Sequence, residues 1–153
     1  MFGFEDKRPA AVEQAGLYIG SMFFGFEEKL GGPLPRQVFT DPYVVGFLEV
    51  LTTHAVAVVY MSGMPDQDTV VDIMAEALDR AWPGAGSAAR MRLVEASNSV
   101  SPFHAEYRRG RHDGSEHVRR LLTTYENMGD ERHKAFRDHV AQTHLRLDDR
   151  TAK

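Results

Sequence analysis

The sequence predicts an all-α fold, a single-domain bundle of six or seven helices around a buried central helix at about 42–62. Two observations lead to this prediction. The stretch from Tyr43 to Met61 is apolar on every face, and such a helix must be enclosed by other helices or by lipid. Elsewhere the apolar residues recur at helical spacing, and no alternating run bounded by turn signals indicates a strand.

Clear start and stop signals flank the central helix. Asp41 is an N-cap residue, and Pro42 follows at the first helical position, where the missing N–H is not needed. Gly63, with Pro65 two residues later, is expected to end the helix through a left-handed cap.

The length of the central helix raises the question of a membrane span. At about 1.5 Å per residue it would measure roughly 28 Å, close to the hydrocarbon thickness of a bilayer. Glu49 and His54 near its middle would be costly in lipid, and no basic cluster flanks it. We therefore expect an enclosed helix, no membrane span and, because the N-terminus lacks the pattern of a signal peptide, a cytoplasmic protein.

A first helix is expected from residue 10 to Leu30, where Gly31-Gly32-Pro33 stops it. It contains Gly16 and Gly20, and glycines four apart allow another backbone to approach closely. That backbone could belong to the central helix or to a second subunit. Residues 31–41 are expected to form an extended connector.

Five further helices follow the central one. The spacing and capping signals predict helices over 66–82, 87–97, 101–110, 115–129 and from 130 onward, with a turn at 111–114. The helix over 66–82 has the cleanest amphipathic pattern. The last helix is expected to face inward with Phe136, Val140 and Leu147.

Composition limits the classes of function. A chain of 153 residues is one domain over 1–153, with residues 1–8 as a candidate flexible arm, and it has no cysteine for disulfides, thiolate metal sites or thiol catalysis. The net charge is −4, with acidic residues in excess in the first half and near balance in the second. Nucleic-acid binding is therefore not expected.

The leading functional hypothesis is a non-enzymatic helical interaction protein that self-associates and could also bind a protein partner. This hypothesis rests on the apolar surface of the first and central helices, which is larger than a single core of this size easily covers. A short repeat of the pattern F-G-F-E-acid-K, at 2–7 and 24–29, is either coincidental or marks docking aromatics. The candidate interface residues are Phe2, Phe4, Gly16, Gly20, Phe23, Phe24 and Phe26.

A rival hypothesis is a small metal- or ligand-dependent enzyme with its site inside the bundle. Glu49 and His54 are five positions apart, about 140° around a helix, and so do not converge. Glu49 is expected either to be satisfied by Thr53 or by a basic residue from another helix, or to bind a ligand.

The most specific version of the enzyme hypothesis is a metal site built from histidines, because six of the seven histidines lie in the last 50 residues. An antiparallel pair of final helices would bring His117 and His144 together as metal ligands, with Glu116 or His104 completing the site. On an α-helix His139 would lie about 100° from the face of His144. No sequence signature of a metal enzyme supports this site. The alternative is that these histidines take part in ordinary packing. The sequence does not identify a cofactor.

A third hypothesis is a regulator that binds an anion or nucleic acid. The only dense basic cluster is Arg108, Arg109, Arg111, Arg119 and Arg120. Arginine forks suit phosphate and carboxylate groups. The alternative is a solvated face paired with Glu106, Asp113 and Glu116, and no glycine-rich nucleotide loop is present.

Overall fold

The computed structural model describes residues 6–123 and 131–146, and these contain helices and no strand. The all-α prediction is confirmed. The elements, in chain order, are α1 (Arg8–Phe23), α2 (Phe26–Leu30), the 3-10 turn η1 (Arg36–Thr40), α3 (Pro42–Tyr60), α4 (Gln67–Ala81), α5 (Ala85–Ala96), α6 (His104–Thr123), α7 (Glu131–Val140) and the π-helical segment η2 (Ala141–Leu145).

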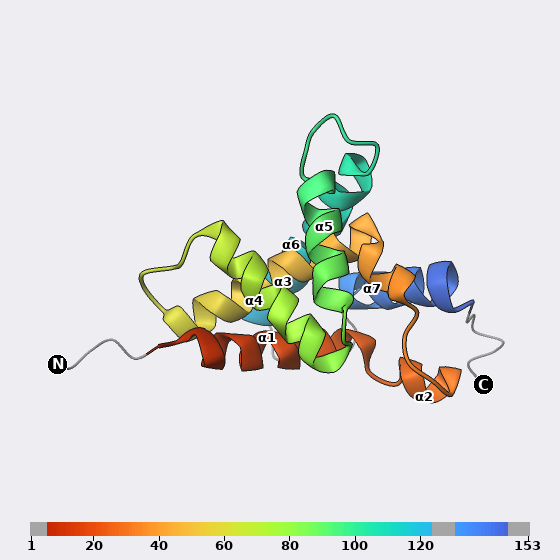
Figure 1. The fold of residues 1–153 in the computed structure, drawn as a ribbon, viewed down its shortest axis with the longest axis horizontal. Coiled ribbons are helices and arrows are strands. Elements are labelled where there is room, and N and C mark those ends of the chain that lie inside the picture. Colours follow the sequence, from red (N-terminus) through yellow and green to blue (C-terminus); the bar gives the residue numbers. More distant parts are fainter. Residues whose placement is uncertain (1–5, 124–130, 147–153) are drawn as a thin grey trace.

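Helix α3 is the centre of the bundle, and α1, α4, α5 and α6 all pack against it (Figure 1). Its first half is almost wholly buried, and its N-terminus is formed as the sequence predicts: the Asp41 side chain accepts a hydrogen bond from the Tyr43 N–H, and Pro42 opens the helix. The helix ends at Tyr60, and Met61 rather than Gly63 is its first residue with positive φ (62°). By length and composition α3 alone among the described helices could cross a membrane; 61% of that stretch is buried inside the protein, and a core helix passes the same test.

The predicted first helix is in fact two helices. Gly25 adopts the left-handed conformation (φ 85°) and breaks the run between Phe23 and Phe26. Phe23 and Phe26, on either side of the break, are both buried in the core, whereas Phe24 between them is 80% exposed. Helix α1 runs along one edge of the molecule (Figure 1).

The sequence prediction was also wrong for residues 101–123. The structure has no turn at 111–114; α6 is one continuous helix of 20 residues. Gly110, expected at a helix end, and Gly114, expected in a turn, both lie within α6 and are buried against α3. Glycine disfavours a helix interior because it loses more backbone entropy on folding than other residues do. Here the close packing of α6 against α3 compensates for that loss, so the helix continues.

The contact between α3 and α6 is backbone to backbone. A Cβ added at Gly110 would collide with the carbonyl oxygen of Tyr43, and one added at Gly46 would collide with that of Tyr107. At Gly114 the nearest atom would be the carbonyl oxygen of Phe47, at 3.1 Å. Glycines on both helices therefore set the distance between them.

This packing predicts the effect of one methyl group. Gly110→Ala should lower the free energy of unfolding by about 1–3 kcal/mol, because the backbone of α3 must move to admit the new Cβ. Urea denaturation followed by circular dichroism measures the loss. Ser115→Ala, at an exposed position of the same helix, is the control and should leave stability unchanged or slightly higher. Equal stability of Gly110→Ala and the wild type would contradict the close contact.

Candidate functional site

Three polar side chains converge at the N-terminus of α3. The Nε2 atoms of His139 and His144 each lie 2.7 Å from the same oxygen, Oδ2, of Asp41. The other carboxylate oxygen, Oδ1, caps α3 by accepting the Tyr43 N–H at 2.9 Å. The side chains are 8% (Asp41), 18% (His139) and 13% (His144) exposed, so the cluster lies at the edge of the core with limited access to solvent.

The π-helical segment η2 brings the two histidines together. On a regular α-helix residues five apart point about 140° away from each other. After Val140 the helix widens into η2, where the hydrogen bonds run from residue i to i+5, so that residues five apart come onto one side. The expectation that His139 lies apart from the face of His144 was therefore wrong, because it assumed α-helical geometry throughout.

The charge state of Asp41 follows from this arrangement. Burial on its own raises the pKa of a carboxyl group. For Asp41 the hydrogen bonds from His139 and His144, together with the electrostatic effect of the two rings, outweigh burial and hold its pKa well below the ordinary value. Asp41 is therefore a carboxylate at neutral pH. It and the two imidazoles offer three metal-ligating atoms that all lie within 4.8 Å of one another.

His117 does not join this cluster. Its ring stacks on the ring of His133, with centroids 5.7 Å apart, and lies beside Phe47. The expected pairing of His117 with His144 was wrong, because His133 rather than residues 141–144 lies opposite His117. The two residues proposed to complete that site also have other partners: Glu116 accepts from Arg119, and the ring of His104 bonds the carbonyl of Ala96.

Glu49 is buried (3% exposed) and fully engaged by its neighbours. Its carboxylate accepts hydrogen bonds from the Tyr107 hydroxyl at 2.5 Å, from Gln67 at 3.0 Å and from the guanidinium of Arg111. Burial and the carboxylate together raise the pKa of Tyr107 to about 12. The expectation of a basic partner from another helix is confirmed, whereas Thr53 bonds the backbone oxygen of Glu49 and not its carboxylate.

Asp113, expected on a solvated face, is in fact a second buried carboxylate. It is 5% exposed, accepts from the Tyr43 hydroxyl at 2.7 Å and pairs with Arg132 at 3.3 Å. Burial, together with the bond to Asp113, raises the pKa of Tyr43.

A sequence signal for these two carboxylates does exist. Residues 43–49 (YVVGFLE) and 107–113 (YRRGRHD) share the pattern Y-x-x-G-x-x-acid. Tyr43 of α3 bonds the acid of α6, and Tyr107 of α6 bonds the acid of α3. The two helices nevertheless cross in the same chain direction, because Gly110 lies against Tyr43 and Gly114, one turn later, lies against Phe47.

The arginine cluster does not converge on one anion site. Arg111 pairs with Glu49, Arg109 with Glu106 at 2.8 Å and Arg119 with Glu116 at 2.5 Å. Arg108 and Arg120 are exposed on the same helix. The Arg109 guanidinium also stacks over the Tyr43 ring, 4.2 Å from its centroid. Two of the three acidic residues expected to pair with the cluster do so, and the third, Asp113, pairs with Arg132 instead.

The outer face of α1 holds the remaining candidate interface residues. An added Cβ at Gly16 or at Gly20 would meet no atom within 4 Å, so neither glycine packs against α3. Leu17 of α1 is 65% exposed, and Phe24, which directly follows α1, is 80% exposed. The inclusion of Phe23 and Phe26 in the interface was wrong, because both side chains are buried in the core of this chain. Phe2 and Phe4 lie outside the described residues.

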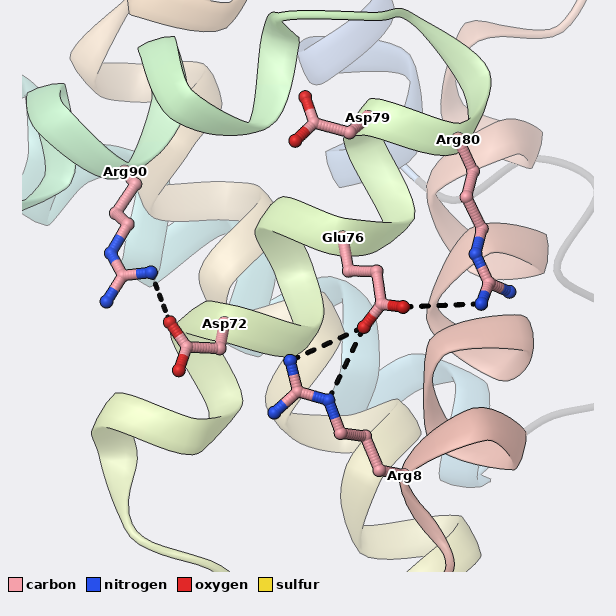
Figure 2. Close-up of a pocket in the computed structure, with 6 residues that line it drawn as sticks. All are labelled: Arg8, Asp72, Glu76, Asp79, Arg80 and Arg90. Carbon is pink, nitrogen blue, oxygen red and sulfur yellow. Dashed lines mark hydrogen bonds and ion pairs between the residues drawn. The ribbon is translucent and has the colours of Figure 1, made fainter.

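An open hollow of about 740 Å³ lies beside α4 and carries charge of both signs (Figure 2). Glu76 bridges Arg8 and Arg80, and Arg90 forms an ion pair with Asp72, although this last contact lacks hydrogen-bond alignment. Asp79 instead accepts a hydrogen bond from the Gly86 N–H at 2.8 Å. Each charged group in the hollow thus has a partner within the chain, and the hollow does not point to a ligand.

Comparison with protein-family models, with curated proteins and with solved structures finds no match to this chain.

Because Glu49 is buried, removal of Arg111, the cation paired with it, should lower the stability of the fold. Arg111→Met should lower the free energy of unfolding by about 1–2 kcal/mol, less than for a fully buried pair because Arg111 is 44% exposed to screening solvent. Chemical denaturation measures the change. The control is Arg80→Met, which breaks an exposed pair and should cost no more than about 0.5 kcal/mol. Equal losses in the two variants would contradict a special role for Arg111.

His54 predicts a pH dependence of stability. Burial against the Tyr18 ring, and to a lesser extent the charge of His117, lowers the pKa of His54 below its ordinary value of 6.5. The unfolded chain therefore binds more protons than the folded one near and below pH 6.5, so stability falls as the pH decreases through this range. His54→Gln should flatten this slope between about pH 7 and 5, as measured by urea midpoints. An unchanged slope would show that His54 titrates alike in both states.

Proposed function

We propose that this chain is a non-enzymatic, cytoplasmic helical protein that self-associates through the outer face of α1. The observation that carries the proposal is the open space around Gly16 and Gly20. Each glycine in a helix interior costs up to about 1 kcal/mol relative to alanine. We infer that a partner helix packs closely against these two glycines, which lie four residues apart, and so offsets their cost.

The other glycines inside helices support this argument. A Cβ on any of them would meet backbone atoms of a neighbouring helix, and these glycines are Gly46, Gly86, Gly110 and Gly114. Within this fold, glycines are thus placed where helices touch. Gly16 and Gly20 follow the same rule if a second helix lies against α1.

A second copy of the chain fits this face better than an unrelated partner. A twofold interface must be complementary to itself. Leu17 and Phe24 lie about equally far on either side of Gly20 and Ser21. When two α1 helices cross antiparallel at this point, Leu17 of each copy lies beside Phe24 of the other, and the glycines provide the space for close approach.

The proposal is tested by measuring mass in solution. Sedimentation velocity of the untagged protein should give a dimer, twice the chain mass of 17.2 kDa, that dissociates on dilution. Gly20→Leu and Leu17→Lys should each shift the protein to monomer, and open space at Gly20 means that the leucine does not disturb the monomer.

Val94→Lys is the matched control, because Val94 on α5 is as exposed as Leu17, 65% in each case. It should leave the dimer intact. A monomer at every concentration, or equal loss of the dimer in all three variants, would refute the proposal. In that case Gly20→Ala should simply raise stability by about 0.5–1 kcal/mol, as at any exposed helical site.

A further inference from the structure

We propose that Asp41, His139 and His144 form a binding site for one divalent transition-metal ion of the zinc class. The site is independent of the self-association proposed above. It rests on three ligand atoms, Oδ2 of Asp41 and the Nε2 atoms of the two histidines, directed at one point from the start of α3 and from the end of the chain's last described helical segment.

The donor set selects the class of ion. Two imidazole nitrogens and one carboxylate oxygen suit zinc and neighbouring transition metals, whereas calcium and magnesium require oxygen ligands. Three protein ligands leave one position of a tetrahedral ion to solvent, and the 8–18% exposure of the side chains leaves a path for an ion to enter.

Only a small movement would admit the ion. Ligand bonds of 2.0–2.2 Å to a tetrahedral zinc place neighbouring ligand atoms about 3.4 Å apart. The Nε2 atoms lie 2.7 Å from Oδ2, so each would retreat by about 0.7 Å. The two histidine rings lie edge to face, with 73° between their planes and 6.3 Å between their centroids, so they do not overlap at the site.

Neighbouring groups hold the ligands in place. The Tyr43 N–H fixes Oδ1 of Asp41 and leaves Oδ2 for the ion, and the Tyr43 ring lies 4.4 Å from the ring of His139. Such support is a regular feature of metal sites, where the atoms around the ligands set their orientation. The π-helical segment η2 is the second feature of this kind, because a regular helix would separate the two histidines.

The competing explanation is a hydrogen-bonded cluster that binds no ion, and glutamine substitutions distinguish the two. Glutamine retains an N–H donor for Asp41 but is a poor ligand for zinc. The experiment titrates Zn²⁺ into the untagged, metal-depleted protein by calorimetry and repeats the titration with Co²⁺, whose visible absorption reports tetrahedral coordination.

The wild type should bind one ion per chain and show the Co²⁺ bands. His139→Gln and His144→Gln should each weaken binding by at least about 100-fold, while His112→Gln, at an exposed histidine of α6, should bind as the wild type does. Circular dichroism checks that each variant folds. Asp41→Asn is a further variant that removes the charged ligand but keeps an N-cap residue, so it should fold and bind weakly.

Absence of saturable binding by the wild type would overturn the proposal and leave the cluster as hydrogen bonds alone. Binding that survives both glutamine substitutions would also overturn it, and would direct attention to the stacked pair His117 and His133.

Discussion

The rest of the structure depends on the close crossing of α3 and α6. Gly46 and Gly110 lie at its centre and let the two backbones touch. On each helix a tyrosine lies three residues before this glycine and an acidic residue three residues after it. The hydroxyl of each tyrosine donates a hydrogen bond to the carboxylate of the other helix. Because the hydroxyls can only reach the acids at this separation, the glycines and the buried hydrogen bonds require each other.

These buried acids in turn fix the surrounding helices. Glu49 draws in Gln67 from the start of α4 and Arg111 from α6, and Asp113 draws in Arg132 from α7. A buried carboxylate is costly unless hydrogen bonds and a cation surround it, so each contact restricts where the neighbouring helix can lie. Asp41, one residue before α3, extends the same principle to His139 of α7 and His144 of η2.

The sequence was sufficient for the fold class, and its failures have physical causes. Asp41 and Pro42 act locally, so the start of α3 could be read directly from the chain. Gly110 and Gly114 could not, because only the opposing helix distinguishes a glycine that ends a helix from one that admits a neighbour. The convergence of His139 and His144 depends on a π-helical turn, for which spacing gives no signal when 3.6 residues per turn are assumed.

The separation of α3 and α6 along the chain has a consequence for biosynthesis. Gly110 leaves the ribosome 64 residues after Gly46, which at 5–20 residues per second corresponds to roughly 3–13 s. During that interval the most apolar segment of the chain exists without the helix that covers it. The nascent protein therefore has a defined period in which α3 can meet chaperones, aggregate or enter a lipid bilayer, and this period ends only when α6 has been synthesised.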